Sequence, residues 1–217
     1  MAITATTSGN SYQHEPIPAG SYLARCYSMV HLGTTEQDFQ GQKKWVNKVR
    51  ITWELPTELK VFSPEKGEQP QAISKEFSLS MHEKATLRAF LTSWRGKGFT
   101  EEEARSFDVT KLLGVECMLS VIHEPGKQDP TKIYEKISSI SRVMKGVVCP
   151  PQINPSFIFT LEEFDQYKFD SLPDWLKDKI RQSQEYKKVI SPEIAHMEEV
   201  KAKVDSFNTE EADDLPF

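Results

Sequence analysis

Alternating apolar and polar side chains predict most of the regular structure of this chain. The clearest example is the segment from Trp45 to Leu55, which Pro56 closes. Its apolar positions fall on one face and its polar positions on the other, as in a half-buried strand. The two sets are Val49, Ile51, Trp53 and Leu55, and Lys48, Arg50, Thr52 and Glu54. Weaker versions of the pattern predict strands over 22–31, 73–81, 114–124 and 133–143, the first ended by Leu32-Gly33-Thr34.

One helix interrupts this series of strands. Apolar residues at spacings of three and four predict an amphipathic helix that Gly96 ends. Ser80 and Glu83 have the spacing of a capping box at its start, and Thr100 and Glu103 repeat that spacing before a second short turn. The apolar stripe consists of Leu87, Phe90, Leu91 and Trp94.

The order of three strands, a helix and two strands is the layout of an OB-fold. We therefore expect a mainly β chain: a five-stranded Greek-key barrel with a helix between strands three and four. A generic five-stranded α+β sheet would give the same string of elements, so it is the structural alternative.

Composition divides the chain into four parts. We expect a flexible arm over 1–18, the OB-fold nucleic-acid-binding domain over 19–146, an aromatic strap and helical extension over 147–204, and a disordered acidic tail over 205–217. The strap is too rich in aromatic residues to stay in water, so we expect it to pack on the barrel. A helix from Leu172 to Ile180 is expected with Ser171 as its cap, and Ser191-Pro192 can open another. The strap aromatics are Phe157, Phe159, Phe164, Tyr167 and Phe169.

Charge separates the same parts. The formal net charge is -5, but residues 1–150 carry 19 Lys and Arg against 17 Asp and Glu, and residues 151–217 carry 8 against 15. This asymmetry is typical of a binding domain with an acidic interaction tail. Cys26, Cys117 and Cys149 form no CxxC pair, which suits a reducing compartment. No signal peptide or membrane-spanning run is evident, so we expect a soluble cytoplasmic protein.

Catalytic motifs find no support in the sequence. The five histidines are scattered, and Thr86 stands where a zinc-protease helix starting at His82-Glu83 needs its second histidine. A Gly-rich phosphate loop and a Gly-x-Ser-x-Gly elbow are also missing from the sequence. We therefore expect a protein that is not an enzyme and needs no cofactor or metal. A nuclease subunit remains the enzymatic alternative.

Basic and aromatic residues gather where an OB barrel would hold a single strand. The ligand face of that fold comes from strands two and three and from the loops joining strands one to two and four to five. Lysines there would meet phosphates and aromatic rings would stack on bases. Trp45 is the best stacking candidate, whereas Trp53 and Trp94 belong to apolar faces and are expected in the core. The candidate nucleic-acid-binding residues are Lys43, Lys44, Trp45, Lys48, Arg50, Lys75, Lys127, Lys132 and Tyr134.

The last residues carry the sharpest functional signal. Two further carboxylates, Glu210 and Glu211, precede an apolar end that is too short to fold alone. The end resembles the acidic tip of bacterial-type single-stranded DNA-binding proteins, where Asp residues precede an aliphatic-Pro-Phe terminus. The resemblance implies sequence-independent binding of single-stranded DNA, with the tip recruiting replication and recombination proteins. The candidate partner-binding residues are Asp213, Asp214, Leu215, Pro216 and Phe217.

A second resemblance covers most of residues 17–185. The segments 78–84, 93–97 and 112–114 are similar to uncharacterised bacteriophage proteins encoded with replication and recombination genes, which implies a host-cell cytoplasm as the location. The chain departs from the cellular binding proteins because a Lys/Glu-rich segment, 184–203, replaces their long Gly/Gln/Pro-rich linker. This departure leaves their tetramer open, with a monomer or a homodimer as equal alternatives. The alternative function is an adaptor that does not bind DNA and mimics the host tip.

Overall fold

The computed structural model describes residues 15–39, 41–126 and 129–191. The acidic tip, the segment from Pro192 onward, most of the arm and Lys127 lie outside these ranges. The elements along the chain are β1 (Gly20–Phe39), β2 (Gln42–Ser63), β3 (Gly67–Ser78), α1 (Thr86–Arg95), α2 (Glu101–Arg105), the 3-10 turn η1 (Val109–Leu112), β4 (Glu116–Pro125), β5 (Ile133–Ser141), β6 (Phe157–Phe159), α3 (Gln166–Ser171) and α4 (Asp174–Arg181).

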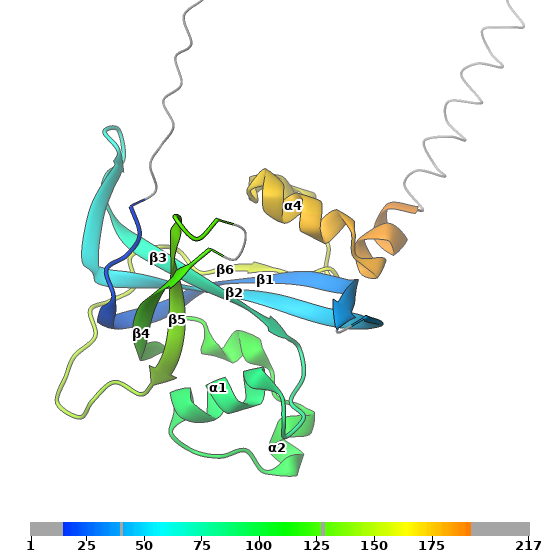
Figure 1. Ribbon diagram of the computed structural model, residues 1–217, viewed down its shortest axis with the longest axis horizontal. Helices are drawn as coiled ribbons and strands as arrows, with labels where there is room; N and C mark the ends of the chain where they lie inside the picture. The colour runs from blue at the N-terminus through cyan, green and yellow to red at the C-terminus, as the bar shows by residue number, and fades with distance from the viewer. Residues whose placement is uncertain (1–14, 40, 127–128, 192–217) are drawn as a thin grey trace, which may run out of the picture.

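The chain is mainly β, and its main sheet is a curled, antiparallel half-barrel. The five long strands are hydrogen-bonded in the order β3-β2-β1-β4-β5, and the short β6 adds to β1 in parallel. Helix α1 lies on one side of this sheet and α4 on the other (Figure 1). The three strands, one helix and two strands expected from the sequence are therefore present in that order.

Strands β1 and β2 are longer than their patterns predict. The expected end of the first strand at Gly33 is wrong, because Gly33 adopts φ 77° within a β-bulge and the ladder continues to Phe39. Pro56 does not close the second strand either. It lies in an irregularity between Leu55 and Leu59, where the ladder with β3 is interrupted and no backbone donor is needed. The third strand begins and ends earlier than expected, at Gly67 and Ser78, and the fifth ends at Ser141.

The inner face of the half-barrel packs on α1. The predicted alternation along β2 is confirmed, since Val49, Ile51, Trp53 and Leu55 are all buried. The Trp53 ring lies 5.8 Å from Phe90 and 5.7 Å from Trp94, measured between ring centroids. Both tryptophans are therefore core residues, as expected.

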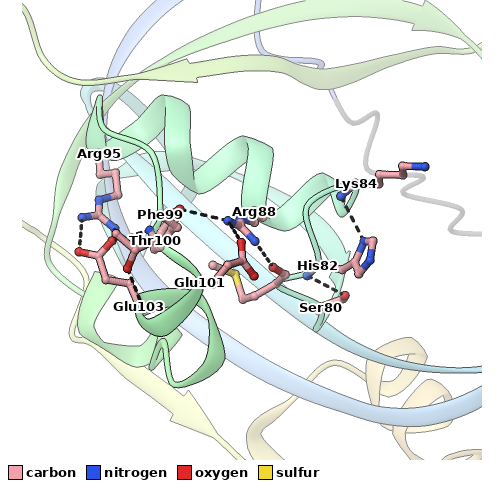
Figure 2. A network of polar contacts seen from close by, with 10 residues as sticks. Ser80, His82, Lys84, Arg88, Arg95, Phe99, Thr100, Glu101 and Glu103 are labelled. Atoms are coloured by element: carbon pink, nitrogen blue, oxygen red, sulfur yellow. Dashed lines mark hydrogen bonds and ion pairs between the residues drawn. The ribbon is translucent and has the colours of Figure 1, made fainter.

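Helix α1 begins later than its capping-box signal predicts. Ser80 does not cap it: the Ser80 hydroxyl accepts a hydrogen bond from the His82 amide, and the helix starts at Thr86 after Ala85. The reason is that residues 80–85 form a turn of their own, closed by a bond from the Ala85 amide to the His82 carbonyl. The second capping box is confirmed, because Thr100 and Glu103 exchange both bonds at the start of α2 (Figure 2).

The C-terminal extension builds a second core on the outer face of the sheet. As expected, the strap packs on the sheet: Phe159 and Phe169 are buried with Val30 and Leu32 of β1. Tyr167 is the exception, because its side chain is 90% exposed. The expected Ser171 cap is also wrong. The Ser171 hydroxyl donates to the Lys168 carbonyl at the end of α3, and α4 starts only after Pro173.

Two charged side chains attach the strap to the sheet. Arg25 of β1 and Glu54 of β2 face each other across the ladder. Arg25 donates to the carbonyls of Pro150, at 2.6 Å, and Cys149, at 3.1 Å. The fully buried Glu54 carboxylate accepts the amides of Ile153, at 2.6 Å, and Asn154, at 2.8 Å, as well as the Asn154 side chain, at 2.7 Å. The two side chains thus form hydrogen bonds with backbone carbonyls and amides of one segment of the strap, residues 149–154.

Replacing Glu54 tests this attachment. We expect E54Q to lower the free energy of unfolding by about 3 kcal/mol, because the new amide group places a donor against buried N–H groups. Urea denaturation measures the change. The matched control is E68Q, since Glu68 is exposed on β3 and forms no ion pair within the described residues. Equal stability of E54Q and E68Q would contradict the attachment.

Candidate nucleic-acid interface

The tip of the β1–β2 hairpin presents two aromatic rings to solvent. Phe39 is 63% exposed and Trp45 is 59% exposed. The turn between them contains Gly41 at φ 80°, and the Gly41 amide donates to the Asp38 carboxylate at 2.8 Å. The Lys44 ammonium lies 5.6 Å from the centroid of the Phe39 ring. The hairpin end therefore combines exposed rings with a cation, the kinds of side chain that proteins use to bind single-stranded nucleic acid.

Alternation along β2 divides the predicted basic residues between two faces. The ladder from Gly33 to Phe39 is regular, so Lys44, Lys48 and Arg50 share the outer face. Lys43 and Trp45 lie on the opposite face of the hairpin. Lys43 also forms a 2.9 Å ion pair with Glu36, which compensates its charge.

Lys48 occupies the middle of the outer row. Its ammonium donates to the side-chain carbonyl of Gln37 at 2.7 Å, and this partner is neutral. No carboxylate of the described residues lies within ion-pair distance of Lys48. The half-buried lysine therefore brings an uncompensated positive charge to the face that the sequence predicts for binding.

Arg50 is used inside the structure instead. Its guanidinium lies 4.7 Å from the Trp175 ring of α4 and 3.5 Å from the Glu76 carboxylate of β3. Glu76 also pairs with Lys179 of α4 at 2.6 Å. Burial lowers the pKa of Arg50, although the Glu76 charge acts in the other direction. Helix α4 thus covers the centre of the predicted strand-binding face.

The segment after α4 is fixed to β1 as well. The Glu185 carboxylate accepts both the amide and the hydroxyl of Thr34, each at 2.6 Å. A Cβ atom at Gly33 would lie 2.5 Å from Cβ of Ser183, so only glycine permits this approach. The extension is therefore attached on both sides of α4 rather than hinged over the sheet.

Lys75 lies at the seam between β3 and β5. Lys75 lies between Ile73 and Phe77 on β3 and shares their inner face. Its ammonium donates to the Ile137 carbonyl at 3.0 Å. Burial, together with the nearby charge of Lys136, lowers the pKa of Lys75. The side chain thus joins two strands between which the sheet has no ladder.

The β4–β5 hairpin carries the remaining predicted residues. Tyr134 is 54% exposed, and Lys132 lies 3.8 Å from the Asp129 carboxylate. Both residues line a hollow of about 480 Å³ that also contains Glu124 and Lys136, which are paired at 2.8 Å. This hairpin therefore offers an aromatic side chain in a region of mixed charge.

A larger hollow was missed by sequence reasoning. It measures about 580 Å³ and lies where the end of β3 meets the start of α1. Its polar lining includes Lys48, His82 and Lys84, the last two on the turn shown in Figure 2. The sequence pattern assigned this turn to a helix start, so the residues were not recognised as a surface. Only the fold brings Lys48 beside them.

The described residues contain no helix long and apolar enough to cross a membrane. Within the same ranges, no three His, Cys, Asp or Glu side chains gather as metal ligands. Comparison of the chain with models of known protein families, with curated proteins and with solved structures gives no match.

The exposure of the tip predicts that its aromatic residues are dispensable for folding. We expect F39A and W45A each to change the free energy of unfolding by less than about 0.5 kcal/mol, because both side chains lie largely in water. W53A, at the centre of the core, is expected to lower it by about 3–5 kcal/mol. Urea denaturation of the three variants measures the difference. A loss at the tip comparable to that of W53A would show that the tip is packed against something.

Proposed function

We propose that this protein binds single-stranded DNA without sequence preference and protects it during bacteriophage DNA replication and recombination. The observation that carries the proposal is the hairpin tip, where Phe39 is exposed beside Lys44 and Trp45 is exposed on the opposite face. Rings of this kind stack on bases of any sequence, and lysines meet the phosphates. The exposed Tyr134 on the β4–β5 hairpin is a further stacking residue.

The sheet order supports an OB-type barrel as the finer description of the fold. Strands β3 and β5, the two ends of the order, approach each other at the Lys75 contact. A partly open five-stranded barrel is typical of the OB-fold, whose first hairpin loop contributes to the ligand face. On this assignment the β1–β2 tip is the loop between strands one and two.

Binding to a labelled oligo-dT strand tests the proposal. We expect fluorescence polarisation to show tight binding that weakens steeply with salt, and little affinity for duplex. W45A should weaken binding about 5- to 150-fold, because loss of one base stack costs about 1–3 kcal/mol. The matched control is Y167A, since Tyr167 is an exposed aromatic residue of α3. Failure of the wild-type protein to bind at low salt would contradict the proposal.

We further propose that residues 213–217 recruit replication and recombination proteins. The Phe217 ring would fill an apolar pocket of the partner while the carboxylates meet Arg or Lys.

One observation favours a second function. Because α4 covers Arg50 and Glu76, single-stranded DNA has no access to the centre of the outer face of β2 and β3. This arrangement suits an adaptor that does not bind DNA and competes for host replication proteins through its tip.

Deleting residues 208–217 separates the two functions. A protein that binds single-stranded DNA keeps its affinity for oligo-dT and loses its protein partners. The reason is that the proposed stacking residues lie on the β1–β2 hairpin and not in the deleted segment. An adaptor shows no DNA affinity with or without the deletion. Polarisation of labelled oligo-dT and pull-down of replication proteins, applied to both forms, measure the two outcomes.

A further inference from the structure

The hollow of about 580 Å³ between β3 and α1 has no role in the proposed function as stated so far. It is lined on its polar side by Lys48, Glu76, Ser78, Ser80, His82 and Lys84. A smaller cavity of about 160 Å³ under α4 shares Lys48 and Glu76 with it. Lys48 and Glu76 therefore lie between the cavity under α4 and the hollow at the start of α1.

The charge of this hollow is positive. Its single carboxylate, Glu76, already lies 2.6 Å from Lys179 and 3.5 Å from Arg50, so two cations compensate one anion. Lys48 and Lys84 have no carboxylate within ion-pair distance among the described residues. Two lysines that form no ion pair with a described residue thus line the hollow, and its one carboxylate is already paired.

Hydrogen-bond donors accompany these cations. Ser78 and Ser80, which carry hydroxyl groups, are among the residues that line the hollow. The His82 ring accepts the Lys84 amide on Nδ1 at 3.3 Å (Figure 2), which leaves Nε2 as the ring nitrogen that can donate. Ammonium, hydroxyl and imidazole donors together fit an anion with several acceptor oxygens, which describes a phosphate.

We infer that this hollow holds a backbone phosphate of the bound single strand. The inference rests on the proposed function and adds the route of the strand. Since Arg50 is covered by Trp175, the strand cannot cross the centre of the sheet. It passes instead from Lys44 at the hairpin tip, along Lys48, to the hollow beside Lys84.

The salt dependence of strand binding tests this route. K84Q removes one phosphate contact, so the slope of log affinity against log salt should fall in magnitude by about 0.7 for a single strand. Affinity at low salt should also fall several-fold. The matched control is K168Q, since Lys168 is exposed on α3 and forms no ion pair with a described residue. Both variants remove one positive charge from the surface, so they separate a local contact from net charge.

The outcomes distinguish the inference from the proposed function. If the wild-type protein binds oligo-dT and K84Q keeps the slope of K168Q, the route is wrong and the proposed function stands. If the wild-type protein does not bind, both are wrong. If inorganic phosphate raises the Tm of the wild-type protein but not of K84Q, while the strand slope is unchanged, the hollow is a site for free phosphate and the route is again overturned.

Discussion

The pair of Arg25 and Glu54 determines where the second half of the chain lies. The two residues are direct neighbours on β1 and β2 and carry opposite charges, and their partners are opposite in kind. Arg25 takes the carbonyls of the strap, and Glu54 takes its amides. Because buried backbone groups need partners of the right polarity, the strap is held in one register and one direction.

The position of the strap determines which charged residues on the outer face of the sheet are covered. From Asn154 the chain enters β6 beside β1, and the second core then buries Val30 and Leu32 on the face opposite Met29. Helix α4 follows on the same side of the sheet, over Arg50 and Glu76. The charges that alternation places on the outer face are consequently divided. Some stabilise the extension, and those near the tip and the hollow stay accessible.

The sequence predicts local structure well where one segment contains the whole signal. The alternation around Trp53 and the stripe ending at Trp94 each identify a buried face without knowledge of any partner. The attachment of the strap could not be predicted, because Glu54 and Asn154 are separated by 100 positions and neither has a distinctive neighbour. The same contrast between local and distant signals holds for the candidate site. The exposure of Trp45 follows from its place beside two lysines, whereas the roles of Arg50 and Lys75 depend on distant elements.

The proposed mode of binding follows from the kind of groups that the fold leaves accessible. Phe39, Trp45 and Tyr134 offer ring faces, and Lys44, Lys48 and Lys84 offer ammonium groups. Ring faces accept any base and ammonium groups meet phosphates, so this set favours binding that does not depend on sequence. Because α4 is attached on both sides, the path along Lys48 exists before a ligand arrives, and binding need not displace the extension. A preformed, sequence-blind path suits a protein that must cover whatever single strand replication exposes.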